Sequence, residues 1–300
     1  MTLRRTLLAA ASTSLLVVSL GLPGSANAQA CPSRSVSLIV SFPPGGDTDA
    51  LARLFGEKLA ARIGQPVVVE NKTGASGTIG NGFVAKAKAD GDTLLFSPNT
   101  MATAPLVLKP GSGVNSLQGL VAAAKAGKIS NCASPGTGSP MHILGQMFNR
   151  SAGIKIDQVP FRGSGPAIVD LIGGQVQMSF DTLPSVLGQV KAGKLKAIAV
   201  TASKRSAQLP NVPTLAEAGV KGVEMSAWYG IYMPASTSKE VQVRVLTEVN
   251  KVLAMPETKS RLDGIGADIT PMTQAKFVEF HTAEYQRFGE LILKKNIKLD

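Results

Sequence analysis

The sequence predicts an α/β protein of two lobes, in which parallel-rich sheets are flanked by helices. Short apolar strands alternate with amphipathic helices along most of the chain, which is typical of parallel sheets covered on both faces. A chain of 300 residues, 44% of them hydrophobic, has length and apolar content enough for about two domains. Glycine-rich loops follow several predicted strands, where a parallel sheet places its loops at one edge.

The first half of this pattern begins with a strand and the turn Phe42–Gly46. The helix that follows carries apolar residues on one face and is stopped by Gly64 and Pro66. The pattern then repeats. Here the predicted strands are 35–41, 67–69 and 93–96, and the predicted helices are 48–63 and 79–89.

The second half continues in the same way and then changes. Strands are predicted at 129–133, 156–160, 176–180 and 196–201, with helices at 116–126, 140–148 and up to residue 172. The last part has a strand-like stretch at 223–233 and helices at 238–254 and 273–294. We expect this late segment to return and pack on the first lobe.

The N-terminus has the composition of a signal peptide. Arg4 and Arg5 precede a mostly apolar run at 6–22, and Ala26-Asn27-Ala28 forms an A-x-A cleavage site. The run contains several serines and is short for a membrane anchor, which is the competing interpretation. We therefore predict cleavage after Ala28, a signal peptide at 1–28 and a periplasmic protein.

Two cysteines leave two possibilities open in an oxidising compartment. Cys31 and Cys132 can form a disulfide, or Cys132 can be a buried thiol within its strand beside a free Cys31.

Charge and motifs exclude several classes of function. The net charge of +11 is dispersed and the aromatic content is 5%, so no nucleic-acid partner is expected. No G-x-G-x-x-G follows a strand, and the two histidines and two cysteines lack zinc-ligand spacing. We expect no catalytic residues, no metal and no cofactor. His281 is expected on the surface and Asp49 at a helix start, while His142 is a possible donor to an anion.

Three glycine loops have the composition of anion-binding loops. Glycines let backbone N–H groups approach a ligand, and the hydroxyls beside the helix starts add donors. Turn and capping roles explain any one loop, but three in one α/β chain favour a binding site. One loop contributes Gly45, Gly46 and Thr48, a second contributes Gly136, Thr137, Gly138 and Ser139, and a third is the segment 161–165.

Blocks along the chain resemble one family. The segments 42–49 (FPPGGDTD), 64–72, 133–139, 159–167 and 170–176 are similar to those of the Bug or TctC proteins, the extracytoplasmic solute receptors of tripartite tricarboxylate transporters. Phe180-Asp181 and the segments 191–197 and 209–214 extend the resemblance, which runs from about Val36 to the C-terminus.

The resemblance implies a type II-like periplasmic binding protein with a ligand cleft between its lobes. Lobe 1 is then 29–102 plus 224–300, and lobe 2 is 103–223. The implied ligand is a small carboxylate (an amino acid, a di- or tricarboxylate or an aromatic acid), delivered to membrane permease subunits. The ligand-binding residues are then expected to be Phe42, Gly45, Gly46, Thr48, Asp49, Ala75, Ser76, Ser97, Ser134, Gly136, Thr137, Ser139, His142, Ser164 and Asp181.

One feature departs from the family pattern. The connection between Met101 and Pro105 is much shorter than in the family, which has a further strand there, so the first lobe is expected to lack a strand. Two alternative functions remain open. One is a secreted enzyme acting on small acids through Asp181 and His142, and the other is a receptor that presents its ligand to a sensor kinase.

Overall fold

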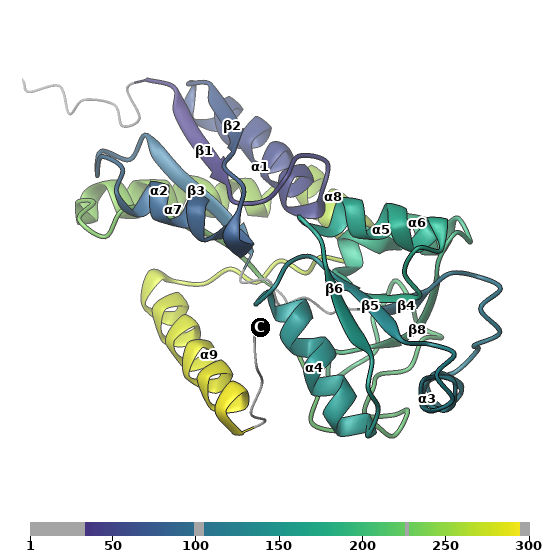
Figure 1. The fold of residues 1–300 in the computed structure, drawn as a ribbon. Coiled ribbons are helices and arrows are strands. Elements are labelled where there is room, and N and C mark those ends of the chain that lie inside the picture. Colours follow the sequence, from purple (N-terminus) through teal and green to yellow (C-terminus); the bar gives the residue numbers. More distant parts are fainter. Residues whose placement is uncertain (1–33, 99–104, 226–227, 295–300) are drawn as a thin grey trace, which may run out of the picture. The chain divides into compact units, whose positions relative to one another are not determined.

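The structure is a computed structural model that describes residues 34–98, 105–225 and 228–294. The predicted signal peptide, Cys31 and the short connection at 99–104 lie outside these residues. Strands and helices alternate along the described chain (Figure 1). The predicted α/β class with parallel-rich sheets is confirmed.

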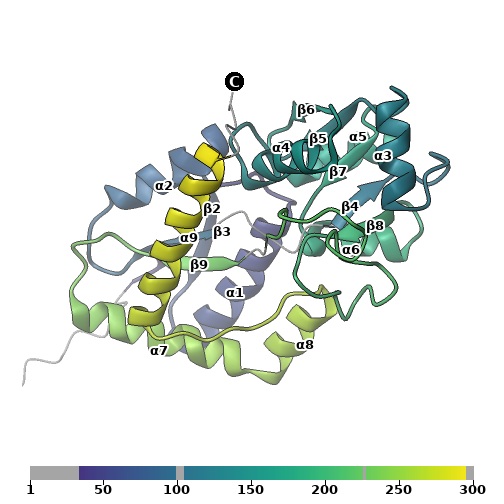
Figure 2. The same ribbon diagram turned by 90° about the horizontal axis from the view of Figure 1, so that it is seen from below.

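The first sheet has four strands in the order β2-β1-β3-β9. Figure 2 labels three of them, β2, β3 and β9. Three are parallel, and β9 pairs with β3 in the antiparallel direction. Leu38, Ile39 and Val40 are all buried, as expected for a parallel strand covered on both faces. Its elements are β1 (Val36–Val40), α1 (Asp47–Ile63), β2 (Val67–Asn71), the 3₁₀ turn η1 (Ala75–Gly77), α2 (Thr78–Ala85), β3 (Thr93–Pro98), β9 (Tyr229–Tyr232), α7 (Lys239–Ala254) and α8 (Pro256–Gly264).

The second sheet has five strands in the order β6-β5-β7-β4-β8. β5, β6 and β7 are parallel, whereas β4 runs antiparallel between β7 and β8. Its elements are β4 (Pro105–Leu108), α3 (Leu117–Lys125), β5 (Asn131–Ser134), α4 (Pro140–Ala152), β6 (Asp157–Pro160), α5 (Ser164–Gly173), β7 (Met178–Phe180), α6 (Leu183–Lys191) and β8 (Lys196–Val200).

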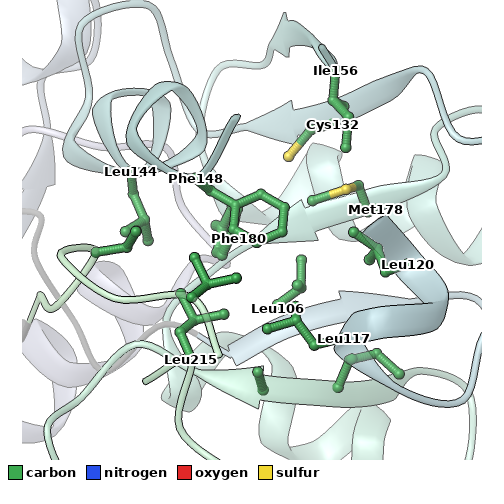
Figure 3. Close-up of a cluster of buried hydrophobic side chains, with 14 of the residues drawn as sticks. Leu106, Leu117, Leu120, Cys132, Leu144, Phe148, Ile156, Met178, Phe180 and Leu215 are labelled. Carbon is green, nitrogen blue, oxygen red and sulfur yellow. The ribbon is translucent and has the colours of Figure 1, made fainter. Parts of the chain in front are cut away.

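A cluster of buried side chains fills one face of the second sheet (Figure 3). Phe148 and Phe180 meet edge to face, with ring centroids 5.4 Å apart. Phe288 and Ile292, near the end of α9 (Gln274–Lys294), pack against this cluster. The C-terminal segment thus supplies β9 to the first sheet and apolar side chains to the second core. The predicted lobe boundaries stay a prediction.

Some elements differ from the sequence prediction. The strand expected at 223–233 is formed only by Tyr229–Tyr232, and the helix expected at 79–89 ends at Ala85. Neither α6 nor α8 was predicted, because each begins with a proline in its first turn, a residue that also marks loops. Cys132 is a buried free thiol, and burial raises its pKa to about 12. With Cys31 outside the described residues, the disulfide stays a prediction.

Hydrogen exchange is expected to be faster in β9 than in β4. β9 lies antiparallel beside β3 in the first sheet, and β4 lies antiparallel beside β7 in the second. β4 is also paired with β8, on its other side. Within the described residues β9 pairs with β3 alone, and a cavity of about 930 Å³ lies beside it. N–H groups on an unpaired edge exchange without breaking a ladder bond. Peptide-resolved deuterium exchange measures this difference, and equal protection of the two strands would contradict it.

Candidate functional site

A small cleft, with a volume of about 30 Å³, lies where loops of both sheets meet at the carboxyl ends of their strands. Its walls follow β1, β3, β5, β6 and β7, so it lies at the place where α/β sheets bind ligands. Phe42 to Pro44 and Gly163 to Pro166 face it from the two sheets. The remaining lining residues are Gly46, Asp47, Thr48, Pro98, Pro135, Met141 and Thr182.

Two helices open into this cleft without a capping side chain. α1 begins after Gly46 and α5 begins after Gly163, and neither N-cap makes a side-chain hydrogen bond. By contrast, Ser or Thr side chains cap α3, α4, α6 and α7. The first N–H groups of a helix lack intrahelical partners and favour a negative charge. The two uncapped starts therefore provide anion-binding donors in one cleft.

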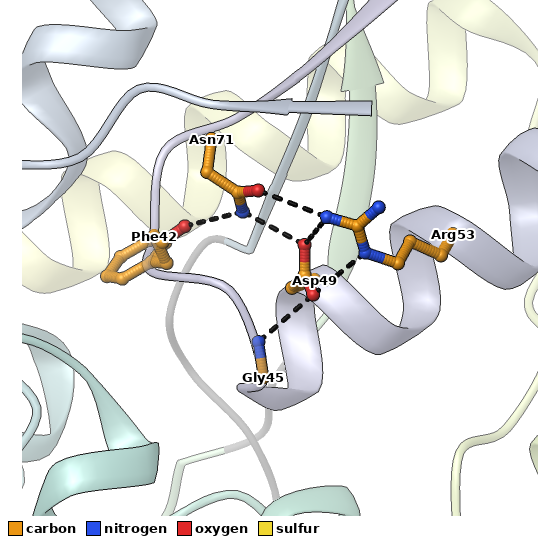
Figure 4. A network of polar contacts seen from close by, with 5 residues as sticks. All are labelled: Phe42, Gly45, Asp49, Arg53 and Asn71. Carbon is orange, nitrogen blue, oxygen red and sulfur yellow. Dashed lines mark hydrogen bonds and ion pairs between the residues drawn. The ribbon is translucent and has the colours of Figure 1, made fainter. Parts of the chain in front are cut away.

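Asp49 fixes the shape of the loop that follows β1 (Figure 4). Its buried carboxylate accepts hydrogen bonds from the Gly45 N–H at 3.0 Å and from Asn71 Nδ2 at 2.9 Å. Arg53, one helical turn later, forms an ion pair with it at 2.9 Å. Burial alone would raise the pKa of Asp49, but the hydrogen bonds from Arg53, Gly45 and Asn71 outweigh it and hold the pKa below its usual value.

On the other side of the cleft, Asp181 directly follows β7 as a fully buried carboxyl group. Its Oδ1 accepts from Ser164 Oγ at 2.6 Å and from the Thr182 N–H at 2.8 Å. Its Oδ2 is buried with no hydrogen-bond partner in the described structure, and so is the hydroxyl of Ser134, which ends the neighbouring strand. Burial is the main cause that raises the pKa of Asp181 to about 7.

Asp181 is expected to lower stability as the pH rises from about 4 to 7. Its folded pKa of about 7 lies above the ordinary value of 3.8, so the folded state keeps a proton that the unfolded state releases. The folded state is therefore favoured at the acidic end of this window. Thermal melts should show the melting temperature of wild type, relative to Asp181→Asn, falling between pH 4 and pH 7. A constant difference over that range would contradict the raised pKa.

Side chains join the two sheets around the cleft. Thr182 Oγ1 donates to Asp47 Oδ2 at 2.6 Å, and the Tyr229 hydroxyl donates to the same oxygen. Ser76 Oγ donates to the carbonyl of Thr137. Gly163 lies so near Pro43 that a β-carbon there would be 3.2 Å from Pro43 Cδ.

The loop after β5 has an unusual backbone. Gly136 has φ +149°, and a β-carbon on it would lie 2.9 Å from Ser76 Oγ. Ser139 caps α4, and His142 Nδ1 accepts the Gly138 N–H at 3.2 Å. His142 is buried, which lowers its pKa. Since His142 bonds to this loop and Asp181 to Ser164 and Thr182, no hydrogen bond described here joins the acid and base of the enzyme alternative.

The structure brings only some of the predicted site residues to the cleft wall. Phe42, Gly46, Thr48 and Ser164 line it. The other predicted residues do not line it. Gly45 and Asp49 bond to each other, Ser97 lies in β3 before its last residue, Ser134 ends β5, and Asp181 follows β7. Ala75 and Ser76 belong to η1, and Gly136, Thr137, Ser139 and His142 form and support the loop after β5.

Sequence reasoning missed Asp47, Thr182 and Tyr229. Asp47 stands in the first glycine loop of the sequence, but it is the first residue of α1. Thr182 followed by a proline two residues later is a helix-start signal that could have been noticed. No sequence signal places the Tyr229 hydroxyl at Asp47, because 182 residues separate them.

Two further features of the described residues bear on the function. They contain no group of three or more His, Cys, Asp or Glu side chains placed to hold a metal ion. Within the same ranges, each helix is too short or too polar to cross a membrane.

The model of one protein family, described as "Tripartite tricarboxylate transporter family receptor" (TctC), matches residues 51–110 and 99–297. The chain belongs to the TctC family. Its resemblance to Bug and TctC proteins is thereby confirmed, and it is a solute-binding receptor of this family. The two matched segments meet at 99–110, where the connection is predicted to be shorter than in the family.

Relatives and solved structures agree with the family. Protein BugT of Bordetella pertussis is 33% identical, over 95% of this chain and 96% of that protein. R. palustris Rpa4515, solved with adipate, has a TM-score of 0.84 at 29% identity, covering 89% of this chain and 98% of that one. MatC from Rhodopseudomonas palustris, solved with bound malate, has a TM-score of 0.80 at 28% identity, covering 87% and 99%. The expected periplasmic-binding-protein fold is confirmed.

Proposed function

We propose that this receptor captures a small carboxylate outside the cytoplasm and delivers it to the permease subunits of a tripartite tricarboxylate-type transporter. The observation that carries the proposal is the pair of uncapped helix starts, at Gly46 and Gly163, that line one cleft. Structural neighbours solved with adipate and malate support the ligand class. The apolar run and A-x-A site at the N-terminus support a periplasmic location.

Binding is proposed to proceed by closure of the two lobes on the ligand. Backbone N–H groups at the starts of α1 and α5, together with the Thr48 hydroxyl, donate to the carboxylate oxygens. Charge-assisted hydrogen bonds of this kind contribute about 1.5–3 kcal/mol each, so several can hold a carboxylate without an arginine. A ligand that bonds to both walls favours the closed form. That form is the proposed signal to the permease.

The cleft is proposed to bind without catalysing a reaction. Its hydroxyl and carboxyl groups bond to one another: Ser164 to Asp181, and Thr182 to Asp47. This arrangement positions the walls of a binding site, and neither contact pairs a hydroxyl with a histidine base.

A thermal-shift screen of the purified protein against mono-, di- and tricarboxylates and amino acids tests the proposed function. We expect at least one acid to raise the melting temperature and to bind with a 1:1 stoichiometry in calorimetry. If no acid stabilises the fold, carboxylate capture is the wrong function. Incubation of any bound acid with the protein, followed by mass spectrometry, should recover it unchanged. Chemical conversion of that acid would favour the enzyme alternative.

A further inference from the structure

We propose that Asp47 makes the cleft selective for carboxylates that also carry a protonated amine, against di- and tricarboxylates. The proposal rests on the proposed function, because it assigns a charge class to the ligand of the same cleft. It differs from what the adipate and malate complexes of the structural neighbours would suggest, since both of those ligands are dicarboxylates.

The charge of the cleft wall is the first support. Among the described residues that line it, Asp47 is the one with a charged side chain, and the lining contains neither Lys nor Arg. Neutral amide donors can hold one carboxylate. A second carboxylate would meet no cation and would approach the Asp47 carboxylate in a partly desolvated site, where like charges repel strongly.

The two helix starts differ in charge, which orients the ligand. The first turn of α1 contains Asp47 and Asp49, of which Asp49 is paired with Arg53, whereas the first turn of α5 contains no acidic residue. The ligand carboxylate is therefore expected nearer the start of α5, and the amine nearer the carboxylate of Asp47.

Asp47 is already held in position to accept from a ligand. Thr182 and Tyr229 both donate to Oδ2, whereas among the described residues the Thr48 hydroxyl alone donates to Oδ1, at 3.4 Å. A carboxylate oxygen accepts about two hydrogen bonds, so Oδ1 keeps acceptor capacity. An ammonium group, with three donors and a positive charge, fits that oxygen.

Asp181 gives a second, independent indication. Its Oδ2 is fully buried and has no hydrogen-bond partner in the described structure, although Thr182, its neighbour, lines the cleft. Native proteins rarely leave a buried polar atom unpaired. A polar group entering the cleft, from the ligand directly or through water, would satisfy it.

Calorimetry with four-carbon acids tests the proposal, because the probes differ in charge at nearly constant size. The probes are succinate, butyrate, L-2-aminobutyrate and 4-aminobutyrate, measured on wild type, Asp47→Asn and Asp157→Asn. Since both hydroxyls donate to one oxygen of Asp47, the asparagine can keep these bonds and lose only the charge. Asp157 is exposed on β6, so Asp157→Asn changes the net charge equally outside the cleft.

We expect wild type and Asp157→Asn to bind one of the aminobutyrates at least about tenfold more tightly than succinate, and Asp47→Asn to reduce this ratio below about threefold. Succinate binding as tightly as both aminobutyrates to wild type would overturn the proposal. So would an aminobutyrate preference that survives in Asp47→Asn. Binding of other acids but of no aminobutyrate overturns the selectivity alone, whereas failure of every acid in the wider screen overturns the proposed function.

Discussion

Replacing Gly136 by valine is expected to abolish carboxylate binding, by at least about a hundredfold in affinity, while the protein stays folded. At φ +149° a residue with a β-carbon is strained by about 1 to 3 kcal/mol. The new side chain would also collide with Ser76 Oγ, which lies 2.9 Å from the position of the β-carbon. The loop after β5 must then move, and Pro135 moves away from the cleft wall with it. Calorimetry measures the affinity, and circular dichroism shows whether the fold persists.

Gly193→Val is the matched control for this prediction. Gly193 also has a positive φ, +70°, but it follows α6, and a β-carbon added to it would have no described atom within 4 Å. Gly193→Val should lose a similar amount of unfolding free energy and keep the affinity of wild type for the carboxylate. If Gly136→Val binds as tightly as Gly193→Val, the loop after β5 does not shape the binding site.

Replacing Asp49 by alanine is expected to cost about 2–4 kcal/mol of unfolding free energy and to weaken binding more than tenfold. The substitution leaves the Gly45 N–H and one Asn71 N–H without their acceptor. The loop that carries Phe42 and Gly46 into the cleft then loses its anchor. Urea unfolding measures the first effect and calorimetry the second.

Arg53→Gln removes the ion pair with Asp49 and leaves the hydrogen bonds of Asp49 with Gly45 and Asn71 in place. The Arg53 side chain is 52% exposed, and exposed ion pairs contribute only about 0–1 kcal/mol. The pKa of Asp49 in the folded state is held below its ordinary value. The contribution of Asp49 to stability is therefore fully present above the ordinary pKa, and it is lost as the pH falls through the lower pKa of the folded state. Asp49→Ala should therefore flatten the acid limb of the stability curve. A larger loss in Arg53→Gln than in Asp49→Ala would contradict the role of Asp49 as the anchor.

Local chemistry explains why much of the fold could be predicted from the sequence. Apolar runs such as Val67–Val69 and the helix stops at Gly64 and Pro66 give strand and helix positions within a few residues of β2 and α1. The glycine loops also follow the strands that form the cleft. Gly46 fits the predicted anion-binding loop, because no side chain there competes with a ligand for the first N–H groups of α1.

The internal partners of the loops could not be predicted from local chemistry. Gly45 was expected to offer its N–H to a ligand, but in the structure that N–H is donated to Asp49. Asp47 meets Thr182 and Tyr229 only because the chain crosses between the two sheets and returns. Such contacts depend on tertiary geometry, which spacing along one segment does not contain.

The predicted loss of a strand from the first lobe stays a prediction, because the short connection lies outside the described residues. β8 lies beside β4 in the second sheet, while β9 has no second strand neighbour in the described part of the first.

A crystal structure of the protein with the tightest acid from the screen tests the central claim most directly. We predict carboxylate oxygens within hydrogen-bond distance of backbone N–H groups at the starts of α1 or α5, between Gly46 and Ser164. An acid located in the cavity beside β9, or bound only by surface lysines, would contradict the amide cleft as the site of capture.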